Sequence, residues 1–371
     1  MKIFFDIRMI SNSGIGVYTS ALLNAVNSED SISEITLGGL SRDKSKYESL
    51  KKIKFIAYDA PIYSIAEQLK GFFLDRKISN KVDLCHFSHY NKSLFTGTPY
   101  VVTIHDTIMF QYGYGNSLKR KIAFWVLKKV VLGAEKVVCI SNTTKKNLLQ
   151  MIPELKVEKT VVIYNPVGVD NLKNHPSDLQ ELYHQINDEY ILCVGNRKKH
   201  KNFEIVINAM DKLKSERPNL KLVLIGGRDS DYDDIDKLIS ELKLSESVVQ
   251  IINANPSQII DFYKNAELVI SPSLLEGFGF IPFESISMGK LPLLSDIEIN
   301  HELFGEDAVY FNQNDADDLT KRILYFLSHK NEATNLVDGM KKYLSIYGFE
   351  RFRTEIIKLY SEVGRSLAVH E

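Results

Sequence analysis

The stretch Ser271-Pro-Ser-Leu-Leu-Glu-Gly-Phe-Gly-Phe-Ile-Pro-Phe-Glu284 decides the fold and points to the chemistry of this chain. The apolar run at 267–271 predicts a buried strand, and Pro282 suits the first position of the following helix. The stretch therefore predicts a strand, a glycine-bearing loop and a helix N-terminus, where free backbone N–H groups bind anions. Two carboxylates, Glu276 and Glu284, flank this predicted anion site. A phosphate between two hydroxyl-binding carboxylates fits a sugar nucleotide.

The two carboxylates differ in how many interpretations they allow. Glu284 falls in the first turn of the predicted helix, where a glutamate often serves only to stabilise the helix dipole. Glu276 stands directly before Gly-x-Gly and gains nothing structural there. The stretch resembles the Glu-x7-Glu motif of retaining glycosyltransferases of family 4, which have the GT-B fold. The segment 285–295 is similar to the same family, and further similar segments extend from residue 3 to about residue 327.

The resemblance implies the GT-B architecture: two Rossmann-like, doubly wound parallel-sheet α/β domains that face each other across a cleft. The hydrophobic pattern independently favours parallel α/β domains, because apolar strand-like runs alternate with longer amphipathic segments. The strands predicted from this pattern are 2–7, 34–38, 54–57, 83–87, 100–105, 136–140, 160–164, 190–195, 220–226, 248–252, 267–271, 291–295 and 308–311.

The length of 371 residues also favours two domains. Tyr164-Asn-Pro-Val-Gly-Val-Asp170 interrupts the pattern and places a hinge near 166–175. We expect an acceptor-binding domain at 1–168 and a donor-binding domain at 175–346. By the resemblance, residues 347–371 form a helix that crosses back to the first domain.

Composition is that of a soluble globular protein, with 44% hydrophobic and 25% charged residues. The pattern contains no bilayer-spanning run and no signal peptide, and Cys85, Cys139 and Cys193 are predicted to be buried thiols, so a cytoplasmic location is expected. Residues 1–168 carry 23 Lys and Arg against 14 Asp and Glu, which suggests an anionic partner for the first half. The run 117–132, which contains Trp125, fits either contact with an anionic membrane or ordinary helix packing. The charge surplus favours peripheral membrane contact, and no nucleic-acid partner is expected.

The loop after the strand at 190–195 is crowded with cations. Arg197 and Lys201 precede a helix expected over 203–213, with Asn202 as its N-cap. Cations beside a helix N-terminus are unfavourable unless an anion neutralises them, which favours a bound diphosphate over a merely solvated basic loop. The run resembles the basic loop of the family's donor domain, in which a lysine before the helix contacts the phosphates.

Other candidate residues follow strands of the first half. Gly14 and Gly16 resemble the family's glycine loop, which lies against the donor phosphate and sugar. Arg8 is either a cleft residue or a structural ion-pair partner. His105 matches the family's cleft histidine, with Asp106 expected to orient it, and the acceptor side is assigned to four residues: Arg8, His89, Asn91 and Asp106.

The segment Gly226-Gly-Arg-Asp-Ser-Asp231 contains Asp-x-Asp, which marks metal-dependent glycosyltransferases of another fold. Further acidic residues follow this segment, which is typical of the solvent-exposed start of a helix. In addition, Arg197 and Lys201 are already expected to neutralise the phosphate charge. We therefore expect no metal and no cofactor besides the donor substrate.

Together these patterns and the resemblance predict a metal-independent retaining hexosyltransferase. It would use a nucleotide-diphosphate sugar, with mannose or rhamnose favoured, and a glycan or polyprenyl-linked acceptor in O-antigen-like or capsule-like polysaccharide synthesis. Catalytic roles are assigned to His105, Lys201 and Glu276. Donor contacts are assigned to Gly14, Gly16, Arg197, Lys201, Glu276, Gly277, Phe278, Gly279 and Glu284. The alternatives are a nucleotide-sugar epimerase or hydrolase on the same scaffold, and a non-catalytic binding protein.

Overall fold

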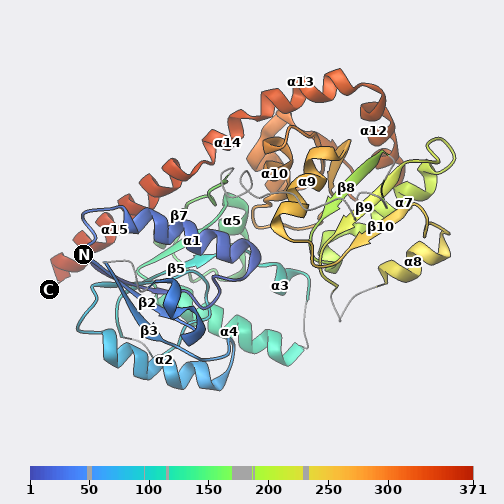
Figure 1. Ribbon diagram of the computed structural model, residues 1–371. Helices are drawn as coiled ribbons and strands as arrows, with labels where there is room; N and C mark the ends of the chain where they lie inside the picture. Colours follow the sequence, from blue (N-terminus) through green and yellow to red (C-terminus); the bar gives the residue numbers. More distant parts are fainter. Residues whose placement is uncertain are drawn as a thin grey trace. The chain divides into compact units, whose positions relative to one another are not determined.

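The computed structural model describes residues 1–47, 52–95, 97–113, 117–168, 186, 189–228 and 234–370. The chain divides into two compact α/β units, and Figure 1 shows a sheet flanked by helices in each. The first unit comprises Met1–Pro166 and Phe349–Glu371, and the second comprises Val167–Gly348. Both sheets are parallel throughout, which confirms the predicted fold class. Each predicted strand is present, with bounds that differ by at most two residues.

The sheet of the first unit has the strand order β3-β2-β1-β4-β5-β6-β7. Pairing is in register, with Phe4 opposite Thr36 on one side and Cys85 on the other. The strand order reverses between β1 and β4, so the loops that follow these two strands diverge to opposite sides of a crevice. The strands are β1 (Lys2–Asp6), β2 (Glu34–Gly39), β3 (Ile53–Ala57), β4 (Leu84–Phe87), β5 (Tyr100–Ile104), β6 (Lys136–Cys139) and β7 (Thr160–Val162).

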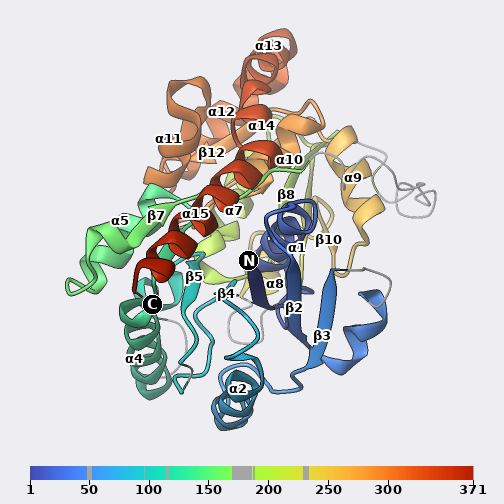
Figure 2. The same ribbon diagram turned by 90° about the vertical axis from the view of Figure 1, so that its left-hand side faces the viewer.

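Helices cover both faces of this sheet (Figure 2). On one face, α1 (Ser13–Asn27) and α15 (Phe349–His370) pack together, with Tyr18 and Tyr360 in a shared core. On the opposite face, α2 (Ile65–Ile78), α4 (Ser117–Gly133) and α5 (Asn142–Met151) share a second core that includes Ile78, Leu127 and Leu148. The shorter elements of the unit are η1 (Ser41–Lys46), α3 (Ile108–Gln111) and η2 (Val157–Lys159).

The sheet of the second unit has the order β10-β9-β8-β11-β12-β13. Here the strand order reverses between β8 and β11, which are direct neighbours through the pair Leu268 and Ile191. The strands are β8 (Tyr190–Val194), β9 (Lys221–Ile225), β10 (Val248–Ile251), β11 (Leu268–Ser271), β12 (Pro292–Ser295) and β13 (Val309–Phe311).

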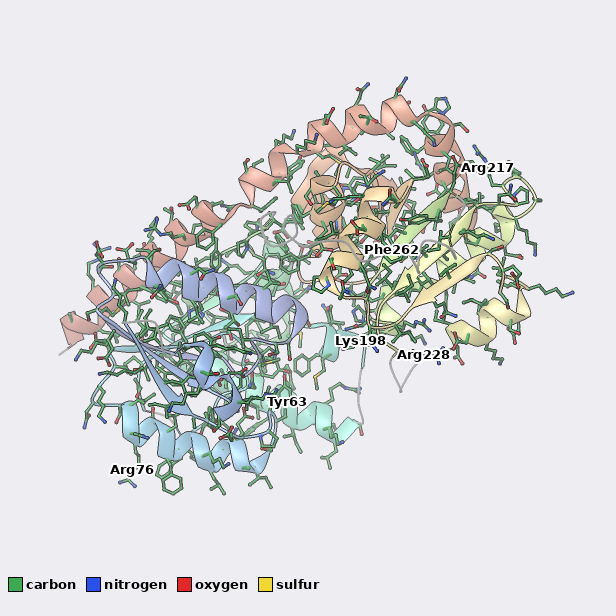
Figure 3. All side chains as sticks on the ribbon, in the orientation of Figure 1. Tyr63, Arg76, Lys198, Arg217, Arg228 and Phe262 are labelled. Carbon is green, nitrogen blue, oxygen red and sulfur yellow. The ribbon has the colours of Figure 1, made fainter. Side chains whose placement is uncertain are left out.

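The second sheet also lies between two helical layers. One core contains Phe203, Ile239 and Ile323 from α7, α8 and α12. The other contains Phe262 and Tyr263 from α9, and Phe262 is labelled among the side chains of this unit in Figure 3. The helices are η3 (Lys199–Lys201), α7 (Phe203–Leu213), α8 (Ile235–Glu241), α9 (Pro256–Asn265), α10 (Ile281–Ser287), α11 (Glu298–Phe304), η4 (Gly305–Asp307), α12 (Ala316–Ser328), α13 (Lys330–Met340) and α14 (Lys342–Ile346).

Cys85, Cys139 and Cys193 are buried free thiols, as predicted. Among the helices of the described residues, none combines the length and the apolar character needed to cross a membrane. The predicted hinge at 166–175 falls largely at 169–175, outside the described residues.

Candidate active site

Two loops of the second unit meet at the point where its strand order reverses. One follows β8 and leads through η3 into α7, and the other follows β11 and leads into α10. The amide of Leu274 donates a hydrogen bond to the carbonyl of His200 at 2.7 Å, which ties the loops together. The carboxyl ends of neighbouring strands at such a reversal are where parallel α/β sheets bind ligands. The cation-rich loop and the carboxylate-bearing glycine loop predicted from the sequence therefore lie together at one site.

Lys201 and Glu276 meet across these loops. Lys201 Nζ donates to Glu276 Oε1 at 2.5 Å, and the hydroxyl of Ser273 donates to the same oxygen at 2.8 Å. The side chains of Lys201 and Glu276 are 22% and 13% exposed, so water reaches this ion pair only partly. Burial opposes ionisation of Glu276, but the charge of Lys201 and the two hydrogen bonds outweigh it and lower the pKa of the carboxyl. Glu276 is thus held as a carboxylate beside an ammonium.

Glu284 lies in the first turn of α10 and faces α9. The hydroxyl of Tyr263 donates to Glu284 Oε2 at 2.6 Å. Burial raises the pKa of Glu284, and the hydrogen bond from Tyr263 only partly offsets it. For Glu284 the sequence allowed either a donor contact or a helix-dipole role, and the donor contact stays a prediction.

Arg197 pairs with a different carboxylate from the one that Lys201 contacts. Its guanidinium is buried and lies 3.6 Å from the carboxylate of Asp236 in α8, while its amide donates to the carbonyl of Gly227 at 3.1 Å. Gly226 permits this arrangement, because a Cβ there would lie 1.8 Å from the carbonyl oxygen of Gly195. Arg197 therefore joins the loops after β8 and β9, and its expected contact with a diphosphate stays a prediction.

In the glycine loop after β11, the Phe278 side chain packs in the core and only the backbone is available for a ligand. Gly279 has a φ of +83°, a left-handed conformation that favours glycine. The ring of Phe278 stacks on Phe283 at 5.2 Å and is 2% exposed, so the side chain belongs to the core. A donor contact is thus left to the backbone of Phe278 and its neighbours Gly277 and Gly279, and this remains a prediction. The helix begins at Ile281, one residue before the expected start.

The expected capping role of Asn202 is wrong. The residue does occupy the N-cap position of α7, but its backbone is left-handed, with φ 53° and ψ 40°, and its side chain makes no cap hydrogen bond. Instead, Nδ2 donates to the carbonyl of Gln313 at 2.9 Å. A left-handed turn lets η3 pass directly into α7, and the asparagine amide holds this turn to the loop after β13.

Gly14 and Gly16 do not form a loop, contrary to expectation. Both lie in the first turn of α1, which begins at Ser13. A Cβ on Gly16 would stand 2.3 Å from the carbonyl oxygen of Ile10. The close approach that glycine permits at this position is therefore to the chain's own backbone, and the expected donor contacts of the two glycines stay predictions.

In the first unit, Arg8 takes the ion-pair alternative. Its guanidinium lies 2.5 Å from Asp6 and 2.7 Å from Glu67, and it covers the ring of Tyr58 at 3.9 Å. The same residue lines a pocket of about 450 Å³ together with Leu40, Asp59, Ala60, Pro61 and Ile62. With two carboxylates against one guanidinium, this wall of the pocket is suited to neutral or hydroxyl-bearing groups rather than to anions.

Polar side chains that follow β4 and β5 also interlock. His105 Nε2 bonds the carbonyl of Ser88 at 2.8 Å, and His89 Nδ1 bonds Asn91 Oδ1 at 2.8 Å. Burial lowers the pKa of His105 to about 4, so this imidazole is neutral near pH 7. The Ser88 carbonyl holds one nitrogen of the His105 ring, Asp106 accepts from the amide of Ile108 at 2.9 Å, and the expected role of Asp106 in orienting His105 stays a prediction.

A buried network that the sequence pattern did not indicate lies beneath these residues. His86 Nδ1 bonds the hydroxyl of Tyr360 at 2.5 Å, and His86 Nε2 bonds Thr103 Oγ1 at 2.8 Å. Tyr18 also bonds Thr103, at 2.8 Å. The network joins β4, β5, α1 and α15, so it fixes the strands whose ends carry Ser88 and His105. No local signal links residues that are 274 positions apart.

The expectation about Asp-x-Asp concerns Asp229 and Asp231, which lie outside the described residues. Among the residues that the structure does describe, no group of three or more His, Cys, Asp or Glu is arranged to hold a metal ion. The expectation that no metal is needed is therefore carried forward untested.

Comparison with known proteins gives two adjacent family matches. The family described as "Glycosyltransferase Family 4" matches residues 14–171, and "Glycosyl transferases group 1" matches residues 174–343. The chain is 26% identical over 278 residues to the O-antigen chain mannosyltransferase RfbU of Salmonella typhimurium, an alignment that covers 75% of this chain and 72% of that protein.

Two further similarities concern a second glycan enzyme and a solved structure. The chain is 27% identical over 205 residues to an N-acetylgalactosaminyltransferase of Campylobacter jejuni whose name specifies a diphospho-undecaprenol substrate; the alignment covers 54% of this chain and 52% of that protein. A crystal structure of Anabaena HepE with UDP and glucose superimposes with a TM-score of 0.75 at 17% identity, covering 98% of this chain and 100% of that one.

Proposed function

We propose that this chain, which belongs to glycosyltransferase family 4 and has the GT-B fold, transfers a hexose from a nucleotide-diphosphate sugar with retention of anomeric configuration. The acceptor is a glycan or a polyprenyl-linked oligosaccharide, and the pathway is the synthesis of a surface polysaccharide. Similarity to an O-antigen mannosyltransferase and to an enzyme that acts on a diphospho-undecaprenol substrate supports this choice. Similarity to the O-antigen mannosyltransferase favours mannose as the transferred sugar. Rhamnose is the second candidate, from the resemblance stated in the sequence analysis.

The observation that carries the proposal is the pair of Lys201 and Glu276 at the reversal point of the second sheet. A donor diphosphate brought to these loops attracts the Lys201 ammonium, which then stabilises the negative charge that grows on the leaving group. Glu276 is left to accept hydrogen bonds from hydroxyls of the donor sugar. Its lowered pKa suits this role, because an ionised carboxylate is the stronger acceptor.

In the proposed reaction, the bond from the anomeric carbon to the phosphate oxygen breaks, and a bond from the acceptor oxygen forms on the same face of the sugar. The proton of the acceptor hydroxyl passes to the departing phosphate, so no protein nucleophile is required. Arg197, Glu284 and the amides of the glycine loop complete the donor site. His105 contacts the sugar or the leaving phosphate, and His89, Asn91 and Asp106 serve the acceptor side. Arg8 supports that side structurally, through its ion pairs with Asp6 and Glu67.

Two substitutions test the donor site. Lys201→Met and Glu276→Gln should each reduce transfer by about tenfold or more, because each removes a charge that contacts the donor. Lys264→Met is the matched control, since Lys264 is an exposed lysine of α9. Thermal unfolding should show that each protein is folded. Full activity of Glu276→Gln would contradict the proposed role of the carboxylate.

The nucleotide and the metal requirement are tested separately. In thermal unfolding, only the nucleoside diphosphate with the matching base should stabilise strongly, by about 2.7 kcal/mol at a hundred times its dissociation constant. The proposal also states that transfer needs no metal. Activity that disappears with EDTA and returns with manganese would refute that part alone.

The proposal includes peripheral contact of the first unit with an anionic membrane, where a polyprenyl-linked acceptor resides. Its support is α4, on which Leu118, Ile122 and Trp125 are each more than half exposed beside a series of lysines. An amphipathic basic helix of this kind lies in a lipid interface.

A further inference from the structure

Tyr63 combines an exposed ring with a backbone conformation that disfavours tyrosine. The residue lies in the loop that leads from β3 into α2 and is labelled in Figure 3. Its φ is 61°, in the left-handed region, where glycine or asparagine is the ordinary residue and a bulky side chain is an outlier. The side chain is 57% exposed, so burial in the core does not explain why tyrosine stands there. An outlier of this kind points to a function for the side chain.

Buried groups hold the backbone of Tyr63 in this conformation. The amide of Tyr63 donates a hydrogen bond to Glu67 Oε2 at 2.8 Å, and Glu67 Oε1 lies 2.7 Å from the Arg8 guanidinium. The next residue, Ser64, accepts from the amide of Glu67 at 3.0 Å and so caps α2. Because Glu67 and Arg8 are both buried, the interior of the unit fixes the left-handed turn.

The ring of Tyr63 is held as well. It meets the ring of His89 edge-on with the ring centres 6.0 Å apart, and the ring of Tyr90 lies at 5.9 Å. The Tyr63 hydroxyl lies 3.4 Å from His89 Nδ1, and the same nitrogen bonds Asn91 Oδ1 at 2.8 Å. An exposed ring that is held at its backbone and at its hydroxyl loses little conformational entropy when a ligand packs on it.

A pocket adjoins this ring. Residues 59–62, which immediately precede Tyr63, line the pocket together with Arg8 and Leu40, and its volume is about 450 Å³. Pockets that bind small molecules have volumes of roughly 300–1,000 Å³. The lining residues follow β1, β2 and β3, so the pocket lies beyond the carboxyl ends of these strands, where parallel sheets bind ligands.

The charges around the pocket are more negative than positive. The Arg8 guanidinium faces two carboxylates, at 2.5 Å and 2.7 Å. Asp59 adds a third carboxylate, and hydrogen bonds from the Ser41 hydroxyl and amide lower its pKa, so it is ionised near pH 7. The second cation is Lys70, whose Nζ donates to the backbone carbonyl of Asp59 at 2.5 Å. Carboxylates accept hydrogen bonds from hydroxyl groups and repel anions.

We propose that Tyr63 and this pocket form a subsite for a neutral hexopyranose unit of the acceptor. The C–H face of the sugar packs on the exposed ring, whose face carries partial negative charge, and hydroxyl groups of the sugar donate to Asp59. The carboxylates around the pocket select a neutral sugar over a uronic acid. This inference rests on the proposed function, because it names the chemistry of the acceptor, but binding of a simple glycoside is measured without the donor.

The direct test is an NMR titration of the full chain with methyl α-mannopyranoside, methyl α-glucopyranoside, methyl α-galactopyranoside and the methyl glycoside of glucuronic acid. At least one neutral glycoside should bind wild type, and the glucuronide should bind at least about tenfold more weakly. Tyr63→Ala and Tyr63→Gly should each weaken binding of the neutral glycoside by about tenfold, since a buried aromatic contact is lost. Glycine suits the left-handed backbone, so Tyr63→Gly should unfold at the temperature of wild type or higher.

The matched control is Tyr325→Ala in the second unit. Tyr325 is also an exposed tyrosine, 43% exposed, whose hydroxyl donates to Glu332 at 2.8 Å and whose ring stacks on His329 at 4.1 Å. This substitution should leave binding of the glycosides unchanged. The proposal is overturned if no neutral glycoside binds wild type, if Tyr63→Ala binds as tightly as wild type, or if the glucuronide binds as tightly as the neutral glycosides.

A kinetic measurement separates failure of the subsite from failure of the proposed reaction. Tyr63→Ala should raise the KM for a glycan acceptor by about tenfold, while the KM for the donor and the thermal stabilisation by a nucleoside diphosphate stay the same. Glycoside binding through Tyr63 in a wild type that transfers no sugar would refute the transferase and leave a saccharide site. Efficient transfer with an unchanged acceptor KM in Tyr63→Ala would remove the subsite alone.

Discussion

Arg8 is a buried charge with several partners in the first unit. It lies between Asp6 and Glu67 and against the ring of Tyr58, and its side chain is 1% exposed. A buried charge is tolerated when its partners satisfy it, but removal of one partner leaves the others buried without compensation. Arg8 therefore fixes both the loop after β1 and the first turn of α2.

We predict that Arg8→Met destabilises the protein by about 3 kcal/mol or more, because two carboxylates lose their common partner in a buried site. Urea denaturation followed by circular dichroism measures the change. Arg42→Met, at an exposed arginine, should alter stability by less than about 0.5 kcal/mol. Similar midpoints for the two variants would show that the ion pairs of Arg8 contribute little.

His86 and His105 give the first unit a dependence on pH. Burial lowers the pKa of His86 to about 3 and that of His105 to about 4, against 6.5 for an ordinary histidine. Below pH 6.5 the unfolded chain binds protons that the folded state does not take up. Their contribution to stability is therefore present above pH 6.5 and is lost as the pH falls toward 4.

Between pH 6.5 and about 4.5, each of these two histidines should reduce the free energy of unfolding by about 1.4 kcal/mol per pH unit. Denaturant titrations at several pH values measure the slope. The variant His86→Gln should reduce the slope of the free energy of unfolding against pH by the contribution of one histidine, even if the variant is less stable at pH 7. An unchanged slope would mean that His86 is protonated in the folded protein.

The sequence predicted some of these side-chain relations and not others. Lys201 and Glu276 were both expected at the donor site because each follows a strand of a parallel sheet, and such strands end on one edge. The choice of Arg8 between ion pair and cleft was open, since the deciding residue, Glu67, lies on a distant helix. Phe278 was assigned to the donor as a residue of the glycine loop, and the packing of its ring on Phe283 was not predicted.

The start of α1 shows how an element depends on one small residue. The backbone of Gly16 lies against the carbonyl of Ile10, and its amide donates to the carbonyl of Asn12 at 2.5 Å. A methyl group there meets backbone rather than a mobile side chain, so the helix must shift as a whole. This contact sets how α1 leaves the loop after β1.

Gly16→Ala should therefore destabilise the protein by about 1–3 kcal/mol, the range for overpacked sites. Thermal or urea unfolding measures it. Gly339→Ala is the control: Gly339 lies in α13 with no heavy atom within 4 Å of its added Cβ, so alanine should be neutral or stabilising by up to about 1 kcal/mol. Destabilisation by both substitutions would point to helix effects in general.

Strands were predictable as elements, whereas the orientation of helices was less so. A strand that is buried on both faces appears in the sequence as a continuous apolar run. The strands β8 and β9, which contain the buried residues Leu192 and Val223, are examples. The rotation of α2 was not predictable, because the partners of Glu67 and Asp75 come from the loop after β1 and from the loop before β5. Asn202 was misassigned for a related reason: its amide has a better partner at Gln313 than at the helix start.

The first unit is assembled from two separated pieces of chain, 1–166 and 349–371. The second piece is α15, which contributes Phe352, Ile356 and Tyr360 to the core on the α1 face of the sheet. Tyr360 also completes the hydrogen bonds of His86. Without α15, this face of the sheet would expose apolar side chains and leave a buried imidazole nitrogen without its partner.

Removal of residues 349–371 should therefore leave the first unit aggregation-prone while the second unit stays folded. The second unit has its own sheet and both of its helical layers within 167–348. Limited proteolysis and calorimetry of the truncated protein should show a protected fragment of the second unit and loss of one unfolding transition. Two intact transitions would show that α15 contributes little to the first unit.

The placement of α15 has a consequence for how the protein is made. A ribosome delivers the seven strands of the first sheet before the second unit, yet it delivers α15, which completes one side of that sheet, only after the whole second unit. Domains that emerge first usually fold first. Here part of the apolar core of the earlier unit stays uncovered until α15 emerges, so nascent chains are expected to depend on a chaperone that shields the α1 side of the sheet in the interval.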